Sequence, residues 1–442
     1  MKYHLHVFGC QMNEADAQRV GSELEKIGLT STDHAREADV IVLDTCVVRQ
    51  SAEDKAYSYI TTLKPIKQKR PDTIVTVMGC MVGVKGNAAL KKQFPWVDVF
   101  MAPSETAPLI NFLRQREAFA LLEAETRQRF AIQDGDLILP SRSDERGSLI
   151  AAHVPIVYGC SHACTFCIIP FRRGVERSRP LGQIAHEVRS LVDQGVKEVT
   201  LLGQIVDRYG KDFDDGPDLS DLLRVINGLD GLERIRFLTS HPNWLNDKLL
   251  DTVAELPKVC EHIEVPVQAG DDDVLRAMKR GYTSDDYRRL IDRIRSKLPH
   301  TSIATDIIVG FPGETEAQFQ ATYDLLDELK LDVAHLAKYS TRPGTVAARR
   351  LGDDVPEEEK ERRWRVLNDQ HARISAGINR RYQDQVVEVL VEDHHKGKWR
   401  GRTRTNKLVF FDDPGEWRGR LVNVRIDKTG PWSMTGTTIN DQ

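Results

Sequence analysis

Three cysteines are grouped within eight consecutive residues, in a Cys-x3-Cys-x2-Cys pattern formed by Cys160, Cys164 and Cys167. Thiolates are soft ligands that bind zinc or iron–sulfur clusters in proteins. Three thiolates leave one iron of a 4Fe–4S cube without a protein ligand, because each iron takes one cysteine. A small molecule could bind that open iron and be reduced there. The spacing therefore predicts a redox-active cluster with one open coordination position.

A structural zinc site is the alternative, with His162 or a distant group as the fourth ligand. Zinc sites usually combine one Cys-x2-Cys pair with a second pair or with two histidines, and no such partner lies nearby in the sequence. His162 also lies inside the short loop, where reaching back to the same metal would strain the backbone. The pattern favours a cluster over zinc.

Three further cysteines, Cys10, Cys46 and Cys80, each follow a run that predicts a β-strand. In an open parallel sheet, ligands collect beyond the carboxyl ends of the strands. The three thiols can therefore meet although 36 and 34 residues separate them. A free cysteine is often only a small apolar residue, and for one cysteine alone that would be the better explanation. Three equivalent placements predict a second three-thiolate metal site.

A stripe of cations near the end of the chain occupies every second position, at Lys396, Lys398, Arg400, Arg402 and Arg404. Alternate side chains of an extended strand share one face. Such a face could follow a phosphate backbone and gain affinity by releasing counterions. A solvated edge strand kept soluble by Lys and Arg is the alternative. The residues alone leave both possibilities open.

A second basic group follows the cysteine loop. It could hold RNA or the carboxylate of a cofactor, and it consists of Arg172, Arg173, Arg177 and Arg179.

The elements that must position the dispersed cysteines alternate between strand and helix. Apolar, β-branched runs predict strands at 3–8, 38–43 and 72–78. Apolar residues at helical spacing predict a helix over 14–27, which Gly28 ends, and further helices over 51–63 and 84–94. This alternation indicates an α/β fold, with a doubly wound parallel sheet in the N-terminal part.

The central part repeats the alternation six times. Strands are predicted at 154–158, 198–202, 235–238, 262–267, 302–308 and 333–339, with helices between them. Such a series predicts a partial (β/α)6, TIM-like barrel, whose functional residues lie at the carboxyl ends of the strands. The cysteine loop comes directly after the first of these strands. A charged helix over 357–378 leads out of the barrel.

The tail from residue 379 has a different character. It carries 12 Lys and Arg against 9 Asp and Glu, a net charge of +3, and predicts strands at 386–391 and 421–426. We interpret it as a small β-barrel of modest positive charge.

The composition limits the class of protein. The 442 residues are 40% hydrophobic and 29% charged, which excludes wholesale disorder. No apolar run approaches the roughly 20 residues that span a bilayer, and the N-terminus leads directly into a strand-like run. Seven cysteines, an odd number, do not suit a disulfide framework. We expect a cytoplasmic protein without membrane contact, in which the net charge of −4 confines any RNA contact to local basic patches.

The cysteine loop resembles the signature of the radical S-adenosylmethionine (SAM) enzymes. In that family the open iron binds the amino and carboxylate groups of SAM, and one electron cleaves the sulfonium to give a 5′-deoxyadenosyl radical. Three segments at strand ends resemble the family's positions for cofactor contacts: 202–204, 266–268 and 306–314. The resemblance implies that Gln204, Gln268 and Asp306 bind the cofactor.

The dispersed triad narrows the resemblance to the methylthiotransferases. The runs FGCQMN (8–13), DTCVVR (44–49) and MGCM (78–81) resemble their three cysteine motifs, and the tail resembles their TRAM module. The resemblance covers nearly the whole chain. It implies a SAM-binding 4Fe–4S cluster on Cys160, Cys164 and Cys167, and a second, sulfur-donating 4Fe–4S cluster on Cys10, Cys46 and Cys80. We call these two sets the loop triad and the strand-end triad.

The residues around these motifs indicate the substrate. Gln-Met-Asn after Cys10 resembles the branch that transfers a methylthio group to C2 of N6-isopentenyladenosine beside the anticodon of tRNA, and GRTRTN at 401–406 points the same way. Two departures concern fine contacts: Gln-Ile-Val-Asp at 204–207 where Gln-Asn-Val-Asn is common, and Asp44 in place of a frequent Asn. The alternatives are threonylcarbamoyladenosine in tRNA, an aspartate of a ribosomal protein, or a non-catalytic, metal-stabilised RNA-binding protein.

The resulting prediction divides the chain into a methylthiotransferase N-terminal domain (1–117), a linker (118–144), a radical SAM core (145–378) and a TRAM domain (379–442). RNA binding is assigned to Lys398, Arg400, Arg402 and Arg404. The implied partners are tRNA, an electron donor such as a flavodoxin or ferredoxin, and a source of sulfur. We expect a monomer.

Overall fold

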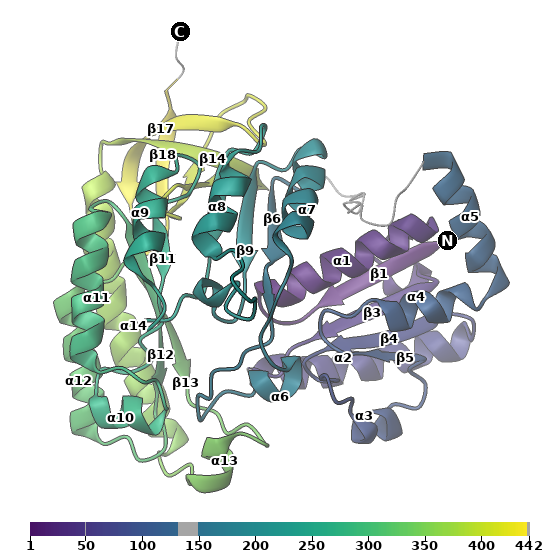
Figure 1. The fold of residues 1–442 in the computed structure, drawn as a ribbon, viewed down its shortest axis with the longest axis horizontal. Coiled ribbons are helices and arrows are strands. Elements are labelled where there is room, and N and C mark those ends of the chain that lie inside the picture. The colour runs from purple at the N-terminus through teal and green to yellow at the C-terminus, as the bar shows by residue number, and fades with distance from the viewer. Residues whose placement is uncertain (49, 131–148, 440–442) are drawn as a thin grey trace. The chain divides into compact units, whose positions relative to one another are not determined.

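The computed structural model describes residues 1–48, 50–130 and 149–439 (Figure 1). Two compact units divide the chain. The first contains Met1–His162, Cys167–Val196 and Leu202–Gln204, and the second contains Ala163–Phe166, Lys197–Leu201 and Ile205–Gln442. Most of the predicted linker lies outside the described residues, but its first part belongs to helix α5 (Glu117–Phe130).

The first unit is built on a parallel sheet of five strands in the order β2-β1-β3-β4-β5. Its strands are β1 (Lys2–Val7), β2 (Thr30–Ser31), β3 (Val40–Thr45), β4 (Ile74–Gly79) and β5 (Val99–Met101). All pairings in it are parallel. The predicted strands are the three at the centre; β2 and β5 are short strands at the edges.

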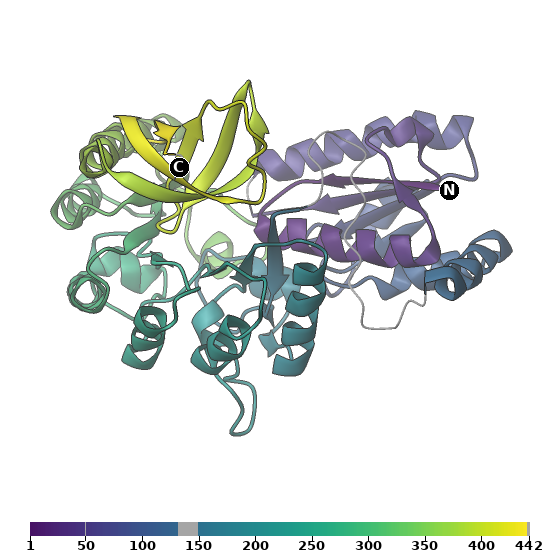
Figure 2. The same ribbon diagram turned by 90° about the horizontal axis from the view of Figure 1, so that it is seen from above.

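Apolar residues on both faces of this sheet explain why β3 and β4 are continuous hydrophobic runs. Ile41 and Leu43 of β3 pack with Ile60 of α2 (Gln50–Lys69) on one face. Val40 and Val42 pack on the other face against α1 (Gln11–Ile27) and α4 (Ala107–Arg114). Figure 2 shows α1 and α2 on opposite sides of the sheet. Helix α3 (Ala88–Gln93) adds Leu90 to the α2 face.

The first unit also contains the elements that flank the cysteine loop in the sequence. They are β6 (Ala151–Pro155), the antiparallel pair β7 (Val157–Tyr158) and β8 (Arg177–Ser178), α6 (Ile169–Arg173) and α7 (Leu181–Asp193). Helix α7 begins after Pro180, as Pro at a helix start favours.

Five of the six predicted barrel strands follow β6 in the chain. They are β9 (Glu198–Leu202), β10 (Arg234–Phe237), β11 (His262–Glu264), β12 (Ser302–Val309) and β13 (Val333–Lys338). β9 pairs in parallel with β10, and β11, β12 and β13 form a parallel sheet. The helices between and after them are α8 (Leu219–Asn227), α9 (Asp247–Glu255), α10 (Asp272–Ala277), α11 (Ser284–Lys297), α12 (Glu316–Leu329), α13 (Val346–Arg350) and α14 (Glu357–Asn379).

Local sequence explains where several of these helices begin. Asp218, Thr283 and Thr315 precede α8, α11 and α12, and each forms a reciprocal capping box with the residue three positions later. A capping box satisfies two backbone donors that a helix start would otherwise leave unpaired.

The tail is a closed barrel of five strands in the order β14-β15-β16-β18-β17. The strands are β14 (Val386–His395), β15 (Lys398–Thr403), β16 (Leu408–Phe411), β17 (Leu421–Thr429) and β18 (Met434–Thr438). Its interior contains Val391, Val409, Phe411 and Val424. The sequence predicted β14 and β17; the three further strands close the barrel and remove its sheet edges.

No helix among the residues that the structure describes combines the length and the apolar character needed to cross a membrane.

Candidate metal centres and cofactor loop

The strand-end triad lies at the carboxyl ends of three neighbouring strands. The register pairs Val7 with Asp44, and Thr45 with Gly79, so β1, β3 and β4 end at the same level. Cys46 and Cys80 directly follow β3 and β4, and Cys10 is the residue before α1. The tertiary structure thus brings these three thiols to one edge of the sheet, as predicted for a switch-point site.

A network of hydrogen bonds links the residues at this edge of the sheet. Asn13 donates through Nδ2 to Asp44 Oδ1 at 2.8 Å and to the Thr45 carbonyl at 3.1 Å. The same carbonyl accepts from the backbone N–H of Cys80 at 2.9 Å. Cys10 Sγ lies 3.5 Å from Asn13 Oδ1. Asn13 therefore connects all three cysteine segments, and sequence reasoning had noticed it only as part of a motif.

The buried carboxyl group of Asp44 stands where asparagine is frequent. Burial, followed by the negative charge of Asp16, raises its pKa well above the ordinary value. A raised pKa favours the protonated carboxyl group, whose shape is close to that of an asparagine amide.

A buried arginine completes the strand-end site. Arg173, at the end of α6, pairs through Nη1 with Asp16 of α1 at 3.0 Å, and their side chains are 3% and 0% exposed. Although burial lowers the pKa of Arg173, Asp16 and the thiols of Cys80 and Cys10 raise it above its ordinary value. Its Nη2 and the Asp44 Oδ2 are buried without a hydrogen-bond partner in the described structure. Buried polar groups nearly always have a hydrogen-bond partner, which can be ordered water or a bound group.

Two other members of the second basic group, Arg179 and Arg172, also make contacts within the first unit. Arg179 donates to Glu187 at 2.5 Å and to the Pro155 carbonyl at 2.7 Å, and its side chain is buried. Arg172 contributes its carbonyl to the N–H of Val84. Two of the four arginines, Arg173 and Arg179, thus lie inside the first unit in ion pairs, because carboxylates from α1 and α7 face them.

The loop triad follows β7, and its first cysteine is anchored by a backbone hydrogen bond. The N–H of Cys160 donates to the Gly174 carbonyl at 3.0 Å. Gly159 has a φ of +68°, and a Cβ there would collide with the Val175 carbonyl, so glycine is required directly before the first cysteine. Cys160 is buried, while Cys164 and Cys167 are partly exposed.

Within the second unit, the residues around Cys164 are held firmly. Thr165 donates its N–H to the Met278 carbonyl at 3.1 Å and its hydroxyl to the Ala277 carbonyl at 2.8 Å. Arg280 donates through Nη1 to Cys164 Sγ at 3.1 Å. Sequence reasoning missed Arg280, because nothing in the sequence signals a contact across 116 residues.

Two of the three predicted cofactor residues are neighbours. Gln268 follows β11 and exchanges backbone hydrogen bonds with β12, donating to the Asp306 carbonyl at 2.9 Å and accepting from Ile308 at 3.0 Å. Gln268 has a φ of +77°, which is uncommon for a residue with a side chain and often marks a functional position. Gln204 belongs to the other unit, at the end of β9.

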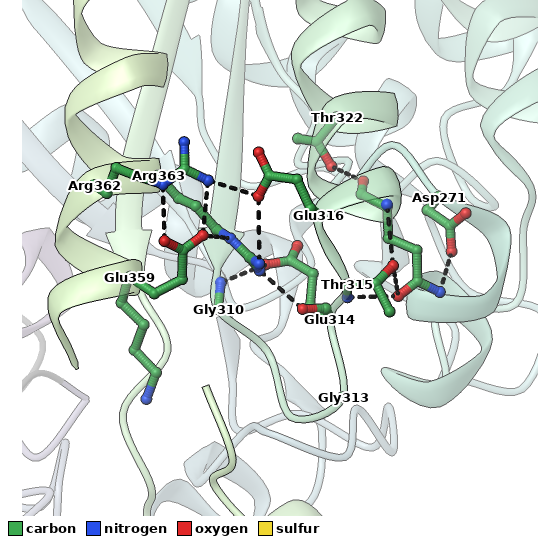
Figure 3. Close-up of polar contacts among 12 residues, drawn as sticks. Asp271, Gly310, Gly313, Glu314, Thr315, Glu316, Thr322, Glu359, Arg362 and Arg363 are labelled. Atoms are coloured by element: carbon green, nitrogen blue, oxygen red, sulfur yellow. Dashed lines mark hydrogen bonds and ion pairs between the residues drawn. The ribbon is translucent and has the colours of Figure 1, made fainter. Parts of the chain in front are cut away.

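The segment 310–314 after β12 forms a tight loop fastened to α14 (Figure 3). Glu314 accepts from the N–H of Gly310 at 2.6 Å and from Arg363 Nη1 at 2.8 Å, and Arg363 also binds the Glu314 carbonyl at 2.9 Å. Both side chains are buried, at 1% and 5% exposure. Gly313 donates to Asp354 at 2.7 Å. A long-range ion pair therefore shapes the loop whose sequence indicated cofactor contact.

Two acidic residues, Glu264 of β11 and Asp306 of β12, influence each other electrostatically. Burial, reinforced by the charge of Asp306, raises the pKa of Glu264 to about 7. Glu264 is also hydrogen-bonded to Thr239 at 3.3 Å. The sequence did not single out Glu264, because its raised pKa depends on burial and on the nearby carboxylate of Asp306, which belongs to another strand.

Within β15, Lys398, Arg400 and Arg402 lie on one face, as the period of two predicts, since the intervening Trp399, Gly401 and Thr403 are buried. Lys396 and Arg404 lie in turns outside the strand, and Lys396 has a φ of +50°, so the prediction that all five cations share one extended face is wrong for these two. Acidic partners from other segments face several members of the stripe. Arg400 pairs with Asp393 at 2.5 Å, and Arg402 with Glu392 at 3.4 Å. Arg404 pairs with Glu261 at 2.7 Å and donates to the carbonyls of two residues near β11, Pro257 and Val259.

Arg404 belongs to a larger contact between the tail barrel and the amino ends of the central strands. Arg236 of β10 donates to the carbonyls of Arg404 at 2.7 Å and Thr403 at 2.8 Å, and pairs with Glu198 of β9 at 2.9 Å. Arg234 donates to the Arg402 carbonyl at 2.6 Å. Figure 1 shows the yellow barrel at this end of β9 and β11. Part of the stripe therefore fixes the barrel to the core.

Comparison with protein families matches three segments. Residues 2–102 match Uncharacterized protein family UPF0004, residues 154–326 the Radical SAM superfamily, and residues 380–439 the TRAM domain. Two curated relatives, both named tRNA-2-methylthio-N(6)-dimethylallyladenosine synthase, match over the whole chain. The relative from Herpetosiphon aurantiacus is 45% identical, covering 100% of this chain and 98% of its own. The relative from Roseiflexus sp. is 46% identical, covering 98% and 89%.

The chain belongs to the tRNA-2-methylthio-N(6)-dimethylallyladenosine synthase family. Relatives of the same name from Chloroflexus aurantiacus and Dehalococcoides mccartyi are 44% and 41% identical over nearly the full length. The family assignment from the cysteine motifs is confirmed, and so is the α/β fold class with its C-terminal barrel.

Among solved structures, a radical SAM methyltransferase, TsrM from Kitasatospora setae with cobalamin and a 4Fe–4S cluster bound, shares the fold. Its TM-score is 0.53 at 15% identity, covering 78% of this chain and 77% of that one. A second structure of TsrM, with tryptophan and a SAM analogue bound, gives a TM-score of 0.51 at 16% identity, covering 76% and 72%. This likeness concerns the fold alone.

Membership in the radical SAM superfamily implies a 4Fe–4S cluster and SAM. The residues present fit a cluster: the donors are soft thiols, and at the strand-end triad the buried Arg173 lies close enough to Cys80 and Cys10 for these thiols to raise its pKa. Among the described residues, no three His, Cys, Asp or Glu side chains converge closely enough to hold a single metal ion. A cube takes one thiolate at each of three irons, so its ligands need not converge on one point.

Proposed function

We propose that this chain transfers a methylthio group to C2 of N6-isopentenyladenosine next to the anticodon of tRNA, as a radical SAM methylthiotransferase. The observation that carries the proposal is full-length identity of 40–46% to relatives with the synthase name, combined with three cysteines at three aligned strand ends. A catalyst for this reaction needs cofactor-derived radical chemistry, because the C2–H bond is too strong for side-chain acids and bases at neutral pH.

We assign two 4Fe–4S clusters to the chain. Cys160, Cys164 and Cys167 would hold the cluster that binds SAM, and Cys10, Cys46 and Cys80 the cluster that carries sulfur. When bound, the SAM-binding cluster supplies the single electron that cleaves the sulfonium. The protein's own residues orient and shield these groups: Asn13 fixes the strand-end cysteines, and Arg173 supplies a buried positive charge beside them.

Gln204, Gln268 and Asp306 are our candidates for contact with SAM. The buried Glu314–Arg363 pair, with the N–H of Gly310 on Glu314, supports the same assignment by holding the following loop in one conformation. Rigid loops at strand ends suit a cofactor whose reactive bond must be aligned with the cluster.

We propose that tRNA is bound in part by the tail barrel, at Lys398, Arg400, Arg402 and Arg404. The exposed Lys398 suits direct phosphate contact, whereas Arg404 is engaged by Glu261. We also retain the division into an N-terminal domain (1–117), a linker (118–144), a radical SAM core (145–378) and a TRAM domain (379–442). The further proposals are a monomer in the cytoplasm, an electron donor such as a flavodoxin or ferredoxin, and a separate sulfur source.

The deciding experiment is nucleoside analysis by mass spectrometry of tRNA from a host that lacks its own enzyme and expresses this chain. We expect 2-methylthio-N6-isopentenyladenosine. A methylthio group found instead on threonylcarbamoyladenosine, or on a ribosomal protein, would overturn the substrate assignment.

Anaerobic reconstitution tests the cofactors. We expect about eight irons per chain and, with a reductant and SAM, release of 5′-deoxyadenosine. Replacing the loop triad with Ala should abolish that release. Replacing the strand-end triad with Ala should preserve the release but prevent sulfur insertion. Zinc binding without SAM cleavage would instead indicate a non-catalytic RNA-binding protein.

A further inference from the structure

A buried guanidinium lies against one ligand of the loop triad. Arg280 is 6% exposed, and its Nη1 donates to Cys164 Sγ at 3.1 Å. Burying an arginine is costly unless its donors are satisfied. Here two further donors are also paired: Nε to the Tyr282 hydroxyl at 2.9 Å and Nη2 to the Pro266 carbonyl at 3.2 Å. The guanidinium is therefore held in one orientation, with its remaining edge toward the sulfur.

The surroundings fix both ends of this contact. The Tyr282 hydroxyl donates to the carbonyls of Pro266 and Val267, at 3.1 and 2.8 Å. On the other side, Thr165, next to Cys164, is tied to α10 and also accepts from the N–H of Ala347 at 2.8 Å. Neither the sulfur nor the guanidinium can move away easily, so the hydrogen bond is a built feature of the fold.

We propose that Arg280 is a positioning residue that sets the reduction potential of the cluster on Cys160, Cys164 and Cys167, by donating a charge-assisted hydrogen bond to the Cys164 sulfur. This inference rests on the proposed assignment of a 4Fe–4S cluster to the loop triad. Hydrogen bonds to ligand sulfurs and nearby charge are main determinants of cluster potential.

The direction of the effect follows from charge. Reduction adds one electron to the cluster, so a positive group at hydrogen-bond distance stabilises the reduced form more than the oxidised form. Little water reaches the buried guanidinium, so its charge is weakly screened. Arg280 therefore raises the potential and makes the cluster easier to reduce. Arg280 also donates to the Pro266 carbonyl, two residues before Gln268.

The test uses the full chain with Cys10, Cys46 and Cys80 replaced by Ala, so that only the loop cluster is present. Its midpoint potential is measured by a redox titration followed by electron paramagnetic resonance. We expect R280Q to lower the potential by at least the equivalent of a tenfold change in the reduction equilibrium, which is about 59 mV for one electron. R280K keeps the charge but loses the fork of donors, and should give a smaller decrease. R276Q, on the exposed side of α10, is the matched control and should leave the potential unchanged.

A second measurement separates tuning from damage. With a weak reductant, R280Q should release 5′-deoxyadenosine more slowly than the parent, and a strongly reducing donor should restore most of the rate. If R280Q does not bind about four irons, the potentials of R280K and Y282F are measured instead. Y282F removes only the hydroxyl that accepts from Arg280 Nε and leaves the guanidinium in place.

Unchanged potentials in all the variants that bind iron would overturn the inference while leaving the proposed function intact. Failure of the parent chain to bind a cluster would overturn the assignment of the loop triad and this inference with it.

Discussion

Gly79 shows how closely the backbone approaches itself beside the strand-end triad. It is the last residue of β4 and directly precedes Cys80, with a φ of +96°. A Cβ at this position would collide with Asp44 and with the backbone of Thr45. These are the groups that hold the segments of Cys46 and Cys10 in place, so the space next to Gly79 belongs to the site.

Gly79→Ala should therefore disrupt the strand-end triad specifically. Gly86→Ala is the matched control, because Gly86 also has a positive φ (+70°) but has no neighbour within 4 Å of an added Cβ. Both substitutions incur backbone strain of about 1 kcal/mol. In a chain whose loop triad is replaced by Ala, we expect Gly79→Ala to lose most of its roughly four irons and Gly86→Ala to keep them. Equal iron contents would contradict the role given to this glycine.

The raised pKa of another single residue, Glu264, should make the stability of the protein depend on pH. The pKa of Glu264 rises from 4.5 in the unfolded chain to about 7 in the folded protein, because of burial and the charge of Asp306. Between these two pH values the folded protein holds a proton that the unfolded chain has released. The contribution of Glu264 to the free energy of unfolding is therefore complete below pH 4.5 and is lost as the pH rises to about 7. The loss amounts to about 3 kcal/mol for a shift of this size.

Glu264→Gln should remove this loss, because an amide has no proton to release. Denaturant unfolding of the metal-free protein at pH 5 and pH 8 measures it, and Glu233→Gln, at an exposed position before β10, is the control. Parallel pH profiles for the parent and Glu264→Gln would show that the carboxyl pair does not titrate in this range.

At the scale of elements, α14 does more than lead out of the central domain. Its first half holds the 310–314 loop through Arg363, and its last residues, Ser375 and Asn379, donate to the carbonyls of Pro431 and Gly430 in the tail. One helix thus contacts both the loop expected to bind the cofactor and the domain expected to bind RNA. The charge pattern predicted this helix, but it did not predict that the helix would contact both the 310–314 loop and the tail barrel.

Arg363→Met should loosen the cofactor loop. It leaves the buried Glu314 without its cation, and breaking such a pair typically costs about 3–5 kcal/mol. We expect lower stability and weaker SAM binding, measured by denaturation and calorimetry on the reconstituted protein. Glu314→Gln in the same chain should recover part of the stability, because it removes the uncompensated charge. Arg365→Met, which breaks an exposed pair with Glu361, should cost less than about 1 kcal/mol; a loss as large as that of Arg363→Met would argue against a special role for the buried pair.

At the scale of the whole molecule, the tail barrel uses one strand for two purposes. In β15 and the turn after it, the face that the sequence assigned to RNA includes Arg404, which the structure commits to Glu261 and two carbonyls of the central domain. Lys398 at the start of the strand is exposed. The stripe should therefore divide into a phosphate-binding end and a docking end.

Substitutions at the two ends should separate these roles. Lys398→Ala should weaken tRNA binding, reduce the slope of log affinity against log salt by about 0.9, and leave the melting temperature unchanged. Arg404→Ala should lower the stability by about 1–3 kcal/mol, because it leaves half-buried partners unpaired. Lys428→Ala, on β17, removes the same charge elsewhere in the barrel. A normal melting temperature with weakened tRNA binding in Arg404→Ala would assign Arg404 to RNA instead.

The sequence alone determined the local and periodic features of this protein. The spacing of Cys160, Cys164 and Cys167 is a property of consecutive residues, and the buried strands before Cys46 and Cys80 are visible as apolar runs. Parallel strands end at one edge of a sheet, so the placement of the strand-end cysteines along that edge could also be inferred.

Only the tertiary structure decided which partners these residues have. Arg280 reaches Cys164, Arg363 reaches Glu314, and Arg404 reaches Glu261 across 116, 49 and 143 residues. The charge and burial of each partner set the energy of the contact and the pKa of Glu264 and Asp44. Such quantities depend on distances in space, which periodicity along the chain does not contain.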